Sequence, residues 1–145
     1  MSPVHVYAGK KVSLSAVPLN AKDFGAVGDG IADDTAAIQR AFDAVDAHSK
    51  ATREIYGNDY GRITGWGVYD GPNQELFFPA GEYRITGTIV GEHAFTLTGE
   101  EGSVIFTEDE DLLMFYFWPA YRISLRDLTF KGGRTHVFSP PTIWM

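Results

Sequence analysis

The sequence predicts a mainly β protein with an amphipathic α-helix near its N-terminus, and three observations lead to that fold class. First, apolar residues recur with the spacing of one helical face at Ile38, Ala41, Phe42 and Val45. Second, from residue 75 on, apolar and polar residues alternate with the period of two that is typical of strands, as in YRITGTI at 83–89. Third, glycine or acidic turns separate these short segments, with no second helical pattern between them. Both a chain winding in strand–turn–strand coils and a small sandwich fit this pattern.

Composition is that of one globular domain and excludes several function classes. The chain has 145 residues, of which 44% are apolar and 21% charged, which is enough to bury a core. A net charge of −7 argues against nucleic acid as a partner. The absence of cysteine excludes thiol catalysis, zinc-thiolate sites and disulfides. The longest apolar run, Leu112 to Tyr121, is about half of the roughly 20 residues that a membrane span needs, so no membrane partner is expected.

We expect four segments along the chain. Residues 1–19 form a short lead-in with β-prone pieces, in which no signal peptide is visible. Residues 20–47 contain a turn-rich stretch followed by the helix, which begins near residue 35. Residues 48–74 are rich in glycine and aromatic residues and predict a long insertion loop. Residues 75–145 contain the strands.

The turn-rich stretch before the helix carries glycines and aspartates with structural roles. Gly25, Gly28 and Gly30 provide positions where the backbone φ angle can be positive. Asp33 and Asp34 precede the helix, where a carboxylate accepts hydrogen bonds from free backbone N–H groups and complements the helix dipole. These five residues are therefore expected to form turns and a helix cap.

Aromatic residues in the 48–74 segment have two interpretations. Tyr56, Tyr60, Trp66 and Tyr69 alternate with glycines, and their flat rings could stack against sugar rings. The alternative is that the loop packs these rings against the strands or against a neighbouring subunit.

In the strand region, two features of the pattern predict local structure. Residues from Leu112 to Phe117 are all apolar, which predicts a strand buried on both faces. The apolar phase reverses after Leu125, which requires a corner near Arg126 and Asp127. A faint repeat, Ile-Thr-Gly at 85–87 and Leu-Thr-Gly at 97–99, is weaker than a solenoid of many coils should display.

Two motifs resemble a known superfamily. NAKDFGAVGDGIADDTAAIQRAFDA at 20–44 and ELFFPAGEYRITGTI at 75–89 are similar to the N-terminal segment of the pectate-lyase-like proteins. These proteins include rhamnogalacturonase- and polygalacturonase-like glycosidases, lyases, epimerases and phage tailspikes. The resemblance implies the first coils of a single-stranded right-handed parallel β-helix. It also implies that the helix covers the open end of the first coil, with Ile38, Phe42 and Val45 as the residues that fill it.

The resemblance also implies a function. The chain would be the N-terminal portion of a carbohydrate-active protein, whose parent is a glycoside hydrolase or polysaccharide lyase acting on pectin-like or other complex polysaccharide. In that superfamily the catalytic groups lie on later coils, so the chain is expected to end before them and to be inactive alone. The alternative is a non-catalytic glycan-binding or structural module of the tailspike or adhesin type, which leaves open a homo-oligomer such as a trimer. A secreted, periplasmic or virion location would follow from the resemblance alone.

The sequence gives little support for catalytic or metal-binding residues. Asp33 and Asp34 are adjacent, whereas hydrolytic carboxylates must face each other across a bond. With Asp29 they lack the spacing and closing glutamate of a calcium loop. The acidic run at 108–111 is expected to be a solvated turn. We therefore expect no catalytic, cofactor-binding or metal-binding residue in this chain, and no cofactor.

Overall fold

The computed structural model describes residues 4–7, 10–13, 18–47, 74–91, 94–117 and 122–138. An α-helix occupies 35–47, and a short 3-10 helix, η1, spans Ala21–Phe24. The strands are β1 (Val4–Tyr7), β2 (Lys10–Ser13), β3 (Leu19–Asn20), β4 (Asp29–Asp33), β5 (Gln74–Phe77), β6 (Gly81–Arg84), β7 (Ile89–Gly91), β8 (Ala94–Thr98), β9 (Ser103–Phe106), β10 (Leu113–Phe117), β11 (Arg122–Arg126), β12 (Thr129–Lys131) and β13 (Arg134–Phe138).

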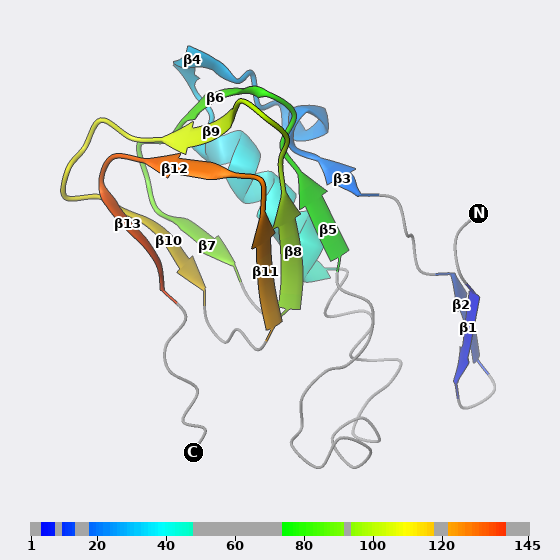
Figure 1. Cartoon of the computed structure of the whole chain (residues 1–145). Coiled ribbons are helices and arrows are strands. Elements are labelled where there is room, and N and C mark those ends of the chain that lie inside the picture. Colours follow the sequence, from blue (N-terminus) through cyan, green and yellow to red (C-terminus); the bar gives the residue numbers. More distant parts are fainter. Residues whose placement is uncertain are drawn as a thin grey trace.

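Most of these strands form three parallel sheets that are wound as a coil. The sheet orders are β11-β8-β5-β3, β12-β9-β6-β4 and β13-β10-β7, while β1 and β2 pair as a separate antiparallel hairpin. From β5 on, each successive strand enters the next sheet, so each strand lies beside the strand three positions earlier in the chain (Figure 1). Three coils result, β5–β6–β7, β8–β9–β10 and β11–β12–β13. The predicted fold class, the first coils of a right-handed parallel β-helix with an N-terminal helix, is confirmed.

The helix takes the place of a strand at one end of the coil stack. β3 pairs with β5, and β4 pairs with β6, so these two strands form an incomplete turn that precedes the first coil. The helix follows β4 directly, at the point in the chain where the third strand of this turn would otherwise pair with β7. Figure 1 shows it beside β7, partly hidden by β9, β12 and β8 in this view. We call the helix end of the stack the head end, and the opposite end, formed by β11, β12 and β13, the tail end.

The core contains ladders of apolar side chains and the inner face of the helix. Leu76 and Leu97 occupy matching positions on adjacent strands, and neither is exposed to solvent. From the helix, Ile38, Phe42 and Val45 are also fully buried. Their burial closes the head end of the stack with apolar side chains.

At the tail end the same ladder comes to the surface. Leu125 on β11 is aligned with Leu97 on β8, yet it is 38% exposed. Within the described residues, β11, β12 and β13 each lie at the edge of their sheet. The tail end therefore presents partly exposed apolar side chains and strand edges without a neighbouring strand among the residues that the structure describes.

Three local predictions can be compared with the structure. The corner near Asp127 is confirmed, because this residue has a φ of 60° between β11 and β12. The prediction that Leu112–Phe117 is buried on both faces is wrong for Tyr116, which is 37% exposed because the outer face of β10 contacts solvent. The Ile-Thr-Gly repeat is not structural, since residues 85–87 follow β6 whereas 97–99 close β8, in a different sheet.

Candidate functional site

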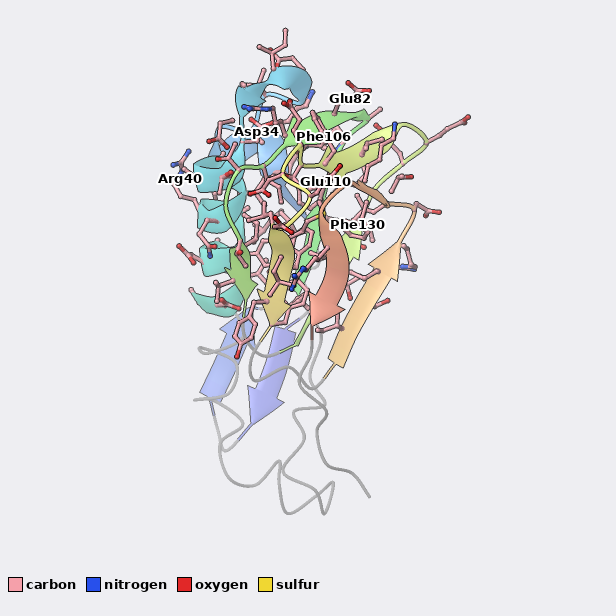
Figure 2. The ribbon with its side chains drawn as sticks, turned by 90° about the vertical axis from the view of Figure 1, so that its left-hand side faces the viewer. Asp34, Arg40, Glu82, Phe106, Glu110 and Phe130 are labelled. Carbon is pink, nitrogen blue, oxygen red and sulfur yellow. The ribbon has the colours of Figure 1, made fainter. Side chains whose placement is uncertain are left out.

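Asp34 joins the start of the helix to the preceding turn. Its side chain is 1% exposed, and its two carboxylate oxygens accept hydrogen bonds from the N–H groups of Val27 at 2.8 Å and Gly28 at 3.0 Å. Its own N–H donates to the carbonyl of Arg84 on β6 at 2.8 Å. Figure 2 shows Asp34 between the helix and the neighbouring strands. The carboxylate expected to cap the helix therefore holds the 27–28 turn instead.

Gly28 is required at that turn for two reasons. Its φ is +71°, a conformation that residues with a Cβ atom rarely adopt. A Cβ atom there would also lie 3.0 Å from the ring of Tyr83 on β6. Gly25 and Gly30 have positive φ angles as well, of 103° and 78°.

Asp33 provides the capping contact and ties the helix to the corner after β6. Its Oδ1 accepts hydrogen bonds from the N–H and the hydroxyl of Thr35, at 3.1 and 2.5 Å. Its Oδ2 accepts one from the hydroxyl of Thr86 at 2.6 Å, while Thr35 Oγ1 accepts one from the N–H of Thr86 at 2.8 Å. The hydroxyl of Thr35, followed by that of Thr86, lowers the pKa of Asp33. Asp33 and Asp34 therefore bind different partners.

Gln39 is a residue that the sequence interpretation missed. Its Oε1 accepts a hydrogen bond from the N–H of Val90 at 2.9 Å, and its Nε2 donates to the carbonyl of Val90 at 2.8 Å. A polar residue between the buried Ile38 and Phe42 was the signal that could have identified it. The carboxamide pairs with β7 as a peptide group of a neighbouring strand would.

On the outer face of the β4-β6-β9-β12 sheet, cationic and aromatic side chains lie in one register position. Arg84 on β6 is aligned with Phe106 on β9, which is aligned with Lys131 on β12. Alternation with the buried Tyr83 and Ile105 places Arg84 and Phe106 on the outside, and Lys131 is exposed. We call these three residues the Arg84–Phe106–Lys131 row.

The charges around this row form a gradient along the sheet. Asp33 on β4 is aligned with Arg84 at one side, whereas Lys131 lies at the other. Glu108 Oε1 lies 3.1 Å from Nε of Arg84, in an ion pair whose glutamate side chain is 71% exposed. Solvent screens the glutamate side of this pair, whereas the Arg84 side chain is only 28% exposed. The row can therefore offer a guanidinium, an aromatic face and an ammonium group to an acidic ligand.

Other expected features are placed as follows. Glu108 to Asp111 are exposed in the β9–β10 connection, where the N–H of Asp111 donates to Oδ1 of Asp109 at 2.9 Å. In the part of the chain that the structure describes, no group of three His, Asp or Glu residues is arranged to hold a metal ion. Tyr56, Tyr60, Trp66 and Tyr69 lie outside the described residues, so their contact with sugar stays a prediction.

Comparisons with known proteins place these features in a family. The family model described as rhamnogalacturonase A/epimerase, pectate lyase-like, matches residues 19–110. The mannuronan C5-epimerases AlgE1, AlgE5 and AlgE3 of Azotobacter vinelandii are each 41% identical to this chain over 68 residues, which is 47% of the chain. The matched part spans 3%, 4% and 2% of those relatives, respectively.

No solved structure gives a significant match. Among the residues that the structure describes, no helix is long and apolar enough to cross a membrane. The matched region, residues 19–110, includes the helix, the first coil, and β8 and β9 of the second coil. The chain belongs to the rhamnogalacturonase A/epimerase family of pectate-lyase-like proteins.

Proposed function

We propose that this chain forms the capped N-terminal coils of a polysaccharide-modifying protein and binds acidic polysaccharide along the Arg84–Phe106–Lys131 row. The row itself is the observation that carries this proposal. Two cations flank an aromatic side chain on an exposed sheet face, in consecutive coils. The names of the mannuronan C5-epimerase relatives, whose substrate is a polyuronate, support the choice of an acidic polymer.

The spacing of the row suits a polymer that carries carboxylates at regular intervals. Neighbouring strands lie about 4.8 Å apart, so the backbones of Arg84 and Lys131 are separated by about 10 Å. An extended polyuronate chain lying across the strands would place successive carboxylates along this line. Arg84 can bind a carboxylate through two N–H groups, Lys131 acts as a point charge, and Phe106 offers a face to the sugar ring between them.

The reaction class that we propose for the parent is removal of the proton next to a uronate carboxylate. Both lyases and C5-epimerases begin with that step, so the epimerase relatives favour it over glycoside hydrolysis. Hydrolysis would require two carboxyl groups facing each other at about 5–9.5 Å. Asp33, which is aligned with Arg84, and the adjacent Asp34 are held by different backbone and hydroxyl partners. The proposal therefore assigns binding, and not catalysis, to the described residues.

Isothermal titration calorimetry with polymannuronate tests the binding function. The chain should bind polymannuronate but not dextran, and more weakly as salt rises. Lys131→Gln should reduce the affinity about two- to fivefold, the value of one exposed ion pair. Lys22→Gln removes the same charge from an exposed position on η1 and should leave the affinity unchanged. Equal losses in both variants would attribute the effect to net charge and contradict the proposed row.

The alternative is a glycan-binding or structural module without any catalysis in its parent. The net charge of −7 favours it slightly, because like charges repel a polyanionic substrate. Proton NMR of polymannuronate incubated with the purified chain should detect neither cleaved nor epimerised residues. Formation of cleaved or epimerised products by the purified chain would overturn the assignment of catalysis to other residues.

A further inference from the structure

Glu108 is held at the end of the Arg84–Phe106–Lys131 row by the residues on either side of it. Thr107 is 6% exposed, and its N–H donates to the carbonyl of Lys131 at 3.1 Å. Oγ1 of Thr107 accepts a hydrogen bond from the N–H of Asp109 at 3.2 Å. These contacts fix the backbone around Glu108 next to β12. The position of Glu108 beside the row is therefore a property of the fold and does not depend on the ion pair with Arg84.

The side chain of Glu108 occupies the guanidinium of Arg84. Its Oε1 accepts a hydrogen bond from Nε of Arg84 at 3.1 Å, and among the described residues Arg84 is the only partner of this carboxylate. The glutamate side chain is 71% exposed, whereas that of Arg84 is 28% exposed. Glu108 can therefore turn into solvent, while Arg84 stays in the row.

Asp33 is a second negative charge near Arg84, and it is not free to leave. It lies on β4 in register with Arg84, and its carboxylate accepts hydrogen bonds from Thr35 and Thr86. The hydroxyls of these two threonines lower the pKa of Asp33, and the charge of Arg84 lowers this pKa further. A ligand carboxylate at Arg84 would be a third negative charge around one cation. Because like charges close together repel, its arrival favours the departure of Glu108.

We propose that Glu108 occupies the carboxylate site of Arg84 in the free chain and is displaced by a carboxylate of the bound polymer. This inference rests on the proposed binding of acidic polysaccharide along the row. Glu108 then selects for acidic chains, because a neutral sugar brings no charge with which to replace it. An acidic polymer must first break the ion pair, so the wild-type chain binds more weakly than the row without Glu108 would.

Glu108→Gln tests this inference, because glutamine keeps the length of the side chain and loses its charge. Isothermal titration calorimetry should give an affinity for polymannuronate about two- to fivefold above that of the wild type, the value of one exposed ion pair. Glu110→Gln is the matched control, since Glu110 lies in the same exposed run but makes no ion pair with another described residue. It should raise the affinity less. Equal gains in both variants would attribute the effect to net charge and contradict the displacement.

The same pair of variants in an Arg84→Gln chain separates the ion pair from other effects of Glu108. Without the guanidinium there is no pair to break, so Glu108→Gln should now raise the affinity no more than Glu110→Gln does. A gain from Glu108→Gln that is as large as in the presence of Arg84 would show that Glu108 does not act through the pair.

Carbon-13 NMR of the Glu108 carboxylate follows the displacement itself. On saturation of the wild-type chain with polymannuronate, its shift should move toward that of the Arg84→Gln chain without polymer, in which Glu108 has lost its partner. A carboxylate shift that stays constant while polymer binds would overturn the inference and leave the binding function standing. If neither the wild type nor Glu108→Gln binds polymannuronate, the binding function fails and this inference fails with it.

Discussion

The ring of Phe42 stacks against the ring of Phe117, with centroids 5.7 Å apart and ring planes 20° apart. The two residues belong to the helix and to β10, which are far apart in the sequence. Phe95 on β8 meets the same Phe42 ring edge-to-face at 5.5 Å. The helix thus inserts an aromatic side chain into the end of the coil stack, where it contacts side chains of the second coil.

Replacing Phe42 by Ala should lower the free energy of unfolding by about 3–5 kcal/mol, because it leaves a cavity among buried rings. Urea denaturation measures this loss. Phe24→Ala, which truncates a partly buried ring at the edge of the core, should cost less. An unchanged urea midpoint for Phe42→Ala would show that the helix does not fill the end of the stack.

Replacing Asp34 by Ala should destabilise the chain by about 1–3 kcal/mol, because the N–H groups of Val27 and Gly28 lose their acceptors. Differential scanning calorimetry should record a lower melting temperature. Asp23→Ala, at an exposed site on η1, is the control and should melt with the wild-type chain. Equal melting of all three proteins would mean that Asp34 does not hold the turn.

Asp33 should make stability depend on acidic pH. Its folded pKa lies below the ordinary 3.8, chiefly because the hydroxyl of Thr35 donates to it. The stabilisation is therefore complete above that ordinary pKa and is lost as the pH falls through the folded pKa. Asp33→Asn does not titrate, so its difference from the wild type in unfolding free energy should shrink on acidification. A difference that stays constant with pH would contradict the assignment.

Tyr83 should produce a second dependence at alkaline pH. Burial, and then the charges of Asp34 and Glu100, raise its pKa from 10.0 to about 12, while its hydroxyl donates to the carbonyl of Pro79 at 2.6 Å. The associated stabilisation is present below pH 10.0 and is lost as the pH rises toward about 12. Phenolate absorbance of the wild type minus that of Tyr83→Phe should titrate near 12. A midpoint near 10.0 would contradict this burial.

The sequence predicted those features that depend on short-range periodicity. The helix was predictable because Ile38, Phe42 and Val45 recur with helical spacing, and the corner at Asp127 because the apolar phase reverses there. The partners of the motif residues were not predictable in this way. Gln39 binds Val90 across 51 positions of sequence, and such a contact depends on how the coil closes.

The Arg84–Phe106–Lys131 row was missed for a related reason. Arg84, Phe106 and Lys131 come together only through strand register, which turns and connections of different length determine. Leu97 of the faint Ile-Thr-Gly repeat is aligned with Leu76 and Leu125, and not with Ile85 of the other copy of the repeat. A short sequence motif is therefore a weaker guide to coil register than the aligned leucines.

The proposal that acidic polysaccharide binds along one face of the first coils is tested most directly by residue-resolved NMR. Backbone amide shifts of the ¹⁵N-labelled chain would be followed during titration with mannuronate oligomers. We expect the largest changes at Arg84, Phe106 and Lys131 and at their neighbours on β6, β9 and β12. An absence of saturable changes, or changes centred on the outer face of β7 and β10 around Tyr116, would contradict the account.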